Sequence, residues 1–154
     1  MQPDKYRLDD FELYQIARFF RQKVYQIARR LPDSEKFSLN VQMRRAALSI
    51  TNNIAEGHGR WHFVENTRFC RIARGSVEEV IDDLNTCLDE KYGDNSVIID
   101  LKNEAYNLIE RINSYIAYLR RTQQGWQPGV QSSSTRPSPR PPDTRLPDTR
   151  PPCV

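Results

Sequence analysis

The sequence predicts an all-α protein: an antiparallel up-down-up-down four-helix bundle followed by a disordered, proline-rich C-terminal tail. Two observations support this fold class. Four long segments carry apolar residues three and four positions apart, which is the spacing of one helix face, and no segment alternates as a strand does. The connections between these segments are short, so sequential helices are expected to run in opposite directions side by side.

The first two helices are bounded by residues that end helices. The first is expected over residues 10–31, and Pro32 ends it because a proline ring cannot continue a helix. The second begins near Leu39 and is expected to stop at Gly57, a residue suited to a left-handed C-cap. Its apolar residues gather on one side at about 100° per residue. They are Met43, Ala47, Ile50 and Ile54.

The third helix is expected over residues 63–91 and the fourth over residues 96–123, with a turn at 92–95 between them. Gly75 lies inside the third helix, where it costs roughly 1 kcal/mol against alanine. We therefore expect a neighbouring segment to approach its backbone closely. Cys70 and Cys87 fall within the periodic segments and are expected to act as small apolar side chains.

The organisation is one domain, residues 1–124, followed by a tail, residues 125–154. The chain has 154 residues, which is enough for one well-formed core. Eight of its ten prolines lie in residues 126–154, a stretch too poor in apolar side chains to offset the entropy of ordering. Pro137–Pro141 resembles a ligand of proline-recognition domains, but a solvated tail is the simpler interpretation.

Composition limits the partners and the compartment. The net charge of +3 is too small for a histone-like nucleic-acid binder, so any nucleic-acid site must come from a local cluster. No apolar stretch has the length of a signal peptide core or a membrane span. The three cysteines have no metal-ligand spacing. We therefore expect a cytoplasmic protein that does not contact a membrane.

No motif of the sequence requires catalysis. His58 and His62 are four residues apart, as metal ligands on a helix can be, but Gly57 and Gly59 are expected to interrupt the helix there. The acidic pairs 78–79 and 82–83 are explained by ion pairing or solvation. We predict no enzyme activity, no catalytic residue, no metal and no cofactor.

Arginine is much more frequent than lysine, which suits bidentate contacts to phosphates. One interpretation is a phosphate-contacting surface that binds RNA or DNA. Its candidate residues are Arg18, Arg29, Arg44, Arg68, Arg71 and Arg74. The alternative is ion pairing within or between subunits, with Glu56, Glu65, Glu78 and Glu79 as the acidic partners.

The second helix also carries a polar face opposite its apolar one. This face consists of Arg45, Ser49, Asn52, Glu56 and Arg60. It is either solvated or a subunit interface, and the mixture of arginine with directed polar groups favours the interface.

The second segment contains a specific motif. It reads Gln42-x-Arg44-Arg45-Ala46-Ala47-x-Ser49-Ile50-x-x-Asn53-Ile54-Ala55-Glu56-Gly57-x-Gly59-Arg60. This motif closely resembles the signature of the bacterial "four helix bundle protein" family, first noticed as reading frames inside intervening sequences of large-subunit ribosomal RNA genes. Residues 69–79 and 113–119 resemble the family's third- and fourth-helix motifs, with Ser114 where the family usually has glycine. The resemblance covers about residues 8–122.

The resemblance implies a left-turning antiparallel bundle that assembles as a cyclic homopentamer without catalytic activity. It implies assembly roles for the matching residues Arg45, Ser49, Asn53, Glu56, Gly57 and Arg60. Distantly similar proteins are the accessory variability determinants of diversity-generating retroelements, where a basic pentamer binds reverse transcriptase and nucleic acid. Two functions follow: an oligomer that binds RNA or a ribonucleoprotein, or a protein-interaction scaffold for a reverse transcriptase or another protein without nucleic-acid contact.

Overall fold

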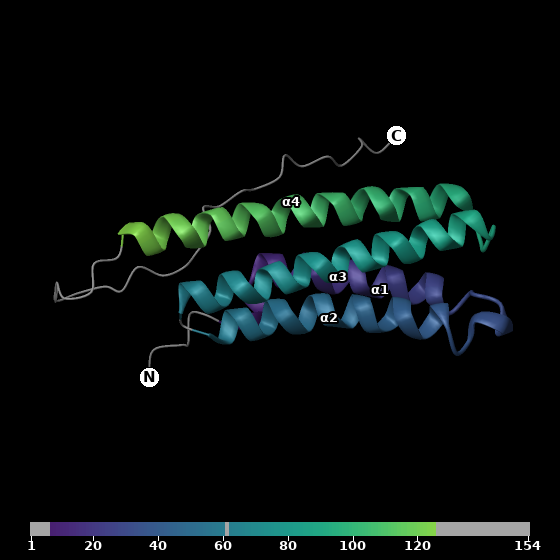
Figure 1. Cartoon of the computed structure of the whole chain (residues 1–154), viewed down its shortest axis with the longest axis horizontal. Coiled ribbons are helices and arrows are strands. Elements are labelled where there is room, and N and C mark those ends of the chain that lie inside the picture. The colour runs from purple at the N-terminus through teal and green to yellow at the C-terminus, as the bar shows by residue number, and fades with distance from the viewer. Residues whose placement is uncertain (1–6, 61, 126–154) are drawn as a thin grey trace, which may run out of the picture.

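A computed structural model describes residues 7–60 and 62–125 and contains four long helices (Figure 1). They are α1 (Glu12–Ala28), α2 (Leu39–Gly59), α3 (Phe63–Asp89) and α4 (Asn95–Gly125). Two short 3-10 helices, Leu8–Asp10 and Asp33–Glu35, precede α1 and α2. The helices run up and down side by side, and the described part of the chain contains no strand, which confirms the predicted fold class. Apart from Gly125, which ends α4, the tail predicted over residues 125–154 lies outside the described residues.

The helices form one apolar core, and of the four contacts between neighbouring helices the α2–α3 contact is the most extensive and the α1–α4 contact the least. The apolar face predicted for the second helix is fully buried, with Met43, Ala47 and Ile50 at 0% exposure. Cys70 and Cys87 are also buried, and burial raises the pKa of Cys70 to about 12, as expected for a thiol that acts as an apolar side chain. No helix of the described residues has the length and apolar character needed to span a membrane.

The helix ends differ from the expected ones by a few residues. α1 ends at Ala28, and the next residues form tight turns in which Arg30 N–H donates to Ile27 O and Leu31 N–H donates to Ala28 O. The turn between α3 and α4 is confirmed. There Gly93 has φ of +91°, which explains a glycine at that position.

The expectation for Gly57 was wrong. α2 continues to Gly59, and Gly57 lies buried inside the helix with no left-handed backbone. A Cβ at this position would lie 2.7 Å from Asn66 Oδ1, 3.3 Å from Asn66 O and 3.2 Å from Phe69 Cβ. Gly57 is therefore needed because α3 crosses α2 there at very short range.

Asn66 extends this close approach to α4. Its Nδ2 donates to the Tyr115 hydroxyl at 3.1 Å, and its Oδ1 accepts from Cys70 Sγ at 3.4 Å. The side chain is 5% exposed, so it can move little to make room for a larger group at residue 57. One buried amide thus joins α2, α3 and α4 near one end of the bundle.

The expectation for Gly75, that a neighbouring segment approaches it closely, was also wrong. This residue is exposed, and a Cβ built on it would meet nothing within 4 Å. No packing inside the chain explains the glycine.

Asp83 is a buried carboxylate on α3, 8% exposed. Burial and the negative charges of Asp82 and Glu79 raise its pKa to about 6. Folding therefore disfavours its charged form.

Substitution of Gly57 by alanine is expected to lower the free energy of unfolding by about 1–3 kcal/mol, the usual cost of overpacking, although alanine is the better helix former. Urea unfolding followed by circular dichroism measures this change. Gly59→Ala is the matched control, since a Cβ at Gly59 meets nothing within 4 Å. Equal stability of the two variants would show that α2 and α3 do not need this glycine.

Asp83→Asn is expected to stabilise the protein above pH 6 and to leave it unchanged near pH 4. The ordinary pKa of an aspartate, taken here for the unfolded chain, is 3.8, whereas the pKa of Asp83 in the folded protein is about 6. The wild type therefore loses stability as the pH rises between these two values. The loss is at most about 3 kcal/mol. Thermal unfolding of both proteins from pH 4 to pH 8 measures the difference, and a pH-independent difference would contradict the assignment.

Candidate functional site

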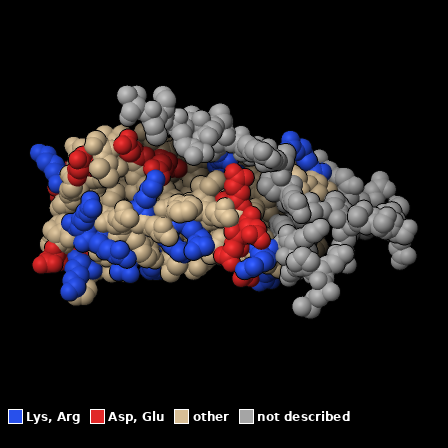
Figure 2. Space-filling view, turned by 180° about the vertical axis from the view of Figure 1, so that it is seen from behind, with Lys and Arg blue, Asp and Glu red and all other residues tan. Residues whose placement is uncertain are grey.

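Charge is distributed unevenly among the helices. Residues 12–59, which span α1 and α2, contain eight basic residues and four acidic ones. Residues 63–89, which form α3, contain three basic residues and six acidic ones. Figure 2 shows Lys and Arg side chains gathered over one half of the rear face and a band of Asp and Glu side chains farther along it. The α1–α2 half is therefore more basic than the small net charge of the chain indicates.

The basic residues of this half are combined with tyrosines. Arg18 lies over the Tyr14 ring at 5.8 Å, and Arg44 of α2 lies over the Tyr25 ring of α1 at 5.0 Å. Such cation–π contacts orient a guanidinium while its N–H edges stay accessible. We call this surface the α1–α2 ridge. It consists of Tyr14, Arg18, Arg21, Tyr25, Arg29 and Arg44.

The packing of α1 on α2 positions the ridge. Arg21 Nη1 donates to Thr51 Oγ1 at 2.8 Å, and Asn40 Nδ2 donates to the carbonyl oxygen of Ala28 at 2.6 Å. These two bonds fix the register of the helices. Arg29 and Arg44 are exposed, whereas Arg18 is half-buried and 3.5 Å from Asp9 Oδ1. The ridge thus presents cations that are held in place but still face solvent.

The structure separates the six predicted nucleic-acid residues into two groups. Arg18, Arg29 and Arg44 belong to the ridge. The other three are on α3. Among these, Arg74 Nη1 donates to Asn113 Oδ1 of α4 at 2.9 Å, and Arg68 and Arg71 are exposed.

The six residues predicted to mediate assembly mostly make contacts inside the chain. Ser49 and Ser76 share a hydrogen bond of 2.8 Å between α2 and α3, and Asn53 Nδ2 donates to Ser49 O at 2.8 Å. Gly57 lies against Asn66, as described above. The motif therefore has a clear role in joining α2 to α3, and its role between subunits stays a prediction.

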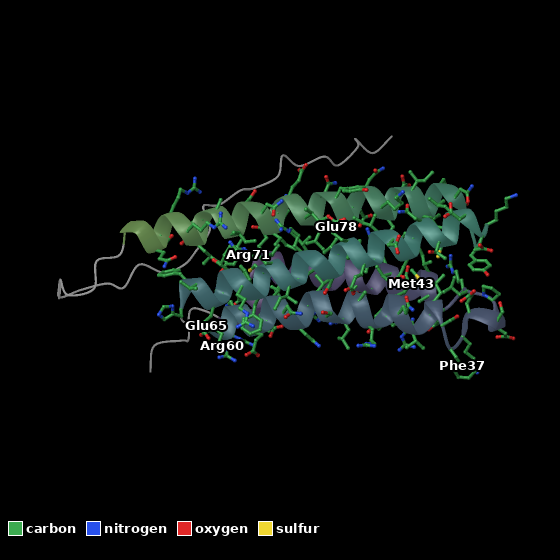
Figure 3. All side chains as sticks on the ribbon, in the orientation of Figure 1. Phe37, Met43, Arg60, Glu65, Arg71 and Glu78 are labelled. Atoms are coloured by element: carbon green, nitrogen blue, oxygen red, sulfur yellow. The ribbon has the colours of Figure 1, made fainter. Side chains whose placement is uncertain are left out.

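Glu56 and Arg60, two further residues of that set, lie at the end of α2. Arg60 Nη2 lies 2.6 Å from Glu56 Oε1, and Arg60 Nη1 lies 3.7 Å from Glu65 Oε1 of α3 (Figure 3). The hydrogen bond and the charge of Glu56 raise the pKa of Arg60 above its ordinary value. The Arg60 guanidinium also lies 5.5 Å from the Phe69 ring centroid. Arg45 alone is exposed without an ion pair among the described residues.

The two histidines do not lie on one helix. α2 includes His58, but it ends at Gly59, so His62 lies outside it as the residue before α3. His58 stacks on Phe11 at 5.2 Å, and burial lowers its pKa. The residues that the structure describes contain no group of three or more potential ligands suited to a metal ion.

Sequence reasoning missed the tyrosines of the ridge and Asn66. Tyr14, Arg18, Tyr25 and Arg29 are spaced by four, seven and four residues, so they share one side of a helix. That spacing was a usable signal. Asn66 had none, because its role depends on Gly57 and Tyr115, which lie on other helices.

Comparisons with known proteins agree with this architecture. The family model described as "23S rRNA-intervening sequence protein" matches residues 9–114. No curated protein matches the chain. The fold is similar to the crystal structure of a protein with unknown function from the S23 ribosomal protein family of Bacteroides thetaiotaomicron VPI-5482. The TM-score is 0.63 at 18% sequence identity, over 68% of this chain and 97% of that chain.

Proposed function

The chain belongs to the 23S rRNA-intervening sequence protein family, and from this premise we propose that it is a non-enzymatic, homo-oligomeric protein that binds RNA through the α1–α2 ridge. The observation that carries the proposal is the stacking of arginines on tyrosines in a half of the molecule where basic residues outnumber acidic ones. We choose RNA as the polyanion to test because the family is named for intervening sequences of 23S rRNA.

The chemistry of the ridge suits a polyanionic strand. Arginine donates two parallel hydrogen bonds to a phosphate, and a guanidinium already held by a tyrosine ring loses less entropy on binding. Arg29, directly after α1, and Arg44 of α2 are both exposed and can contact successive phosphates. The rings of Tyr14 and Tyr25 are half-buried, so they orient arginines instead of stacking on bases. We therefore propose binding that depends on the backbone and only weakly on base sequence.

Assembly would multiply this surface. The family resemblance leads us to propose a ring of five subunits, in which each subunit presents one ridge. Several ridges on one particle raise the effective concentration of sites along a single RNA strand, so modest contacts give tight binding. This supports an RNA-binding role for a chain whose net charge is only +3.

The variant Arg18→Ala/Arg29→Ala/Arg44→Ala is expected to weaken binding of a single-stranded RNA at least tenfold. Each arginine that contacts a phosphate releases a counterion on binding, so the slope of log affinity against log salt should also become shallower by about 2. Fluorescence anisotropy with a labelled RNA measures both quantities. The salt concentration is varied between about 50 and 300 mM, a range over which screening increases and the Debye length shortens.

Arg120→Ala/Arg121→Ala is the control, because these arginines are exposed on α4, away from the ridge. This variant should lose much less affinity than the ridge variant. Equal losses in both would show that binding follows total charge and not the ridge. Undetectable RNA binding by the wild type at low salt would favour the other function, a protein-interaction scaffold or accessory factor for a reverse transcriptase.

A further inference from the structure

Phe37 is the most exposed large apolar side chain among the described residues. It lies in the connection between α1 and α2 and is 87% exposed. Figure 3 shows its side chain pointing away from the bundle. Within residues 29–45, Val41 is the only other large apolar residue that is exposed, at 45%. The connection therefore presents one aromatic ring to solvent, and not an apolar patch of the size that a protein partner usually covers.

The turn that carries Phe37 is held by the carboxylate of Glu35. The Ser38 hydroxyl donates to Glu35 Oε2, and the backbone N–H of Leu39 donates to the same oxygen at 3.3 Å. The hydroxyl of Tyr92, a residue just after α3, donates to Glu35 Oε1 at 3.2 Å. The hydrogen bonds from Ser38 and Leu39 lower the pKa of Glu35, so the carboxylate stays ionised at neutral pH. Because the backbone on both sides of Phe37 is fixed, the ring loses little freedom when a ligand covers it.

Cations surround this ring. Lys36 Nζ lies 5.5 Å from the Phe37 ring centroid. Residues 29–45 contain five basic residues and two acidic ones. In the part of the chain that the structure describes, Arg29, Lys36 and Arg44 take part in no ion pair. The surroundings of the ring therefore attract an anionic ligand.

The ring also adjoins the end of the α1–α2 ridge. Asn40, in the first turn of α2, donates to the carbonyl oxygen of Ala28 at 2.6 Å. This bond brings Phe37, three residues before Asn40, to the same end of the bundle as Arg29. Arg44 lies one helical turn beyond Asn40, which is about 6 Å along the axis. A strand whose phosphates contact Arg29 and Arg44 can therefore place a base on the ring.

We propose that Phe37 stacks on an unpaired base of the bound strand, which makes single-stranded RNA the ligand class of the α1–α2 ridge. This inference rests on the proposed function, because it assigns the kind of RNA that the same surface binds. In an A-form duplex each base is covered by its neighbours, so only a single strand, a loop or an end can offer a base to the ring. Every base has a π-face, so stacking adds affinity without requiring a particular sequence.

A protein partner would use Phe37 differently. It would bury the ring in a pocket, where apolar volume matters more than a flat π-face. Lysine is depleted in protein interfaces, whereas Lys36 lies directly beside this ring. A single ring among cations is instead the combination found where proteins bind single-stranded nucleic acids.

Phe37→Ala is expected to weaken binding of a labelled single-stranded RNA about tenfold, the effect of one lost base stack. Phe37→Trp keeps a π-face and should bind as tightly as the wild type. Phe37→Leu keeps only apolar volume and should lose about as much affinity as Phe37→Ala. The slope of log affinity against log salt should stay the same in all three, because no phosphate contact is lost. Fluorescence anisotropy measures affinity and slope, and thermal unfolding checks that each variant is as stable as the wild type.

Variation of the RNA tests the same contact from the other side. An abasic strand of equal length keeps the phosphates and loses the bases, so the wild type should bind it about tenfold more weakly than the intact strand. Phe37→Ala should bind the two strands equally, since the partner of the bases is already gone. On an RNA duplex, Phe37→Ala and the wild type should have the same affinity.

Tyr106→Ala is the control, because it removes a ring that is 50% exposed on α4. It should leave every affinity unchanged. No loss in Phe37→Ala, an equal loss on single strand and duplex, or wild-type affinity in Phe37→Leu would each overturn base stacking. The ridge would then still stand if the triple arginine variant loses affinity. Undetectable binding of every RNA by the wild type would overturn the stacking and the proposed RNA-binding function together.

Discussion

The close approach of α2 and α3 at Gly57 is the constraint on which the rest of the structure depends. With Asn66 so near, residue 57 cannot carry a side chain without displacing a buried amide that also binds Tyr115 of α4. The helices must therefore cross at this point, and farther along the seam the Ser49–Ser76 hydrogen bond keeps the same register. Once α2 is fixed, its outer residues are fixed as well, including Arg44, which meets Tyr25 of α1.

This constraint also explains why the motif of the second helix identifies the fold better than the function. Its polar residues look like an exposed recognition surface on a helical wheel, but Ser49 and Asn53 are used to join α2 to α3. Arg60 is held by Glu56 and lies over Phe69. A polar side chain on a helix can bind a neighbouring helix of the same chain or a second subunit. A helical wheel cannot distinguish these two contacts.

Periodicity predicted four helices with nearly correct bounds because burial of an apolar face is a local pattern with a period of 3.6 residues. The same reasoning assigned both helical glycines wrongly. Gly57 was expected to end a helix and instead allows close packing, whereas Gly75 was expected to allow packing and is open. The reason for Gly57 lies in atoms of another helix, which the pattern within one helix does not contain. Partners such as Arg74 and Asn113, 39 residues apart, were unpredictable for the same reason.

Net charge is a poor guide to this molecule because charge of each sign is concentrated on different helices. A chain of +3 contains a basic ridge on α1 and α2 and a face on α3 whose two halves have opposite signs. A surface of one sign can attract only a partner of the other sign, such as a polyanion. The ridge therefore suits a polyanion such as RNA, whereas the α3 face, which contains both signs, does not.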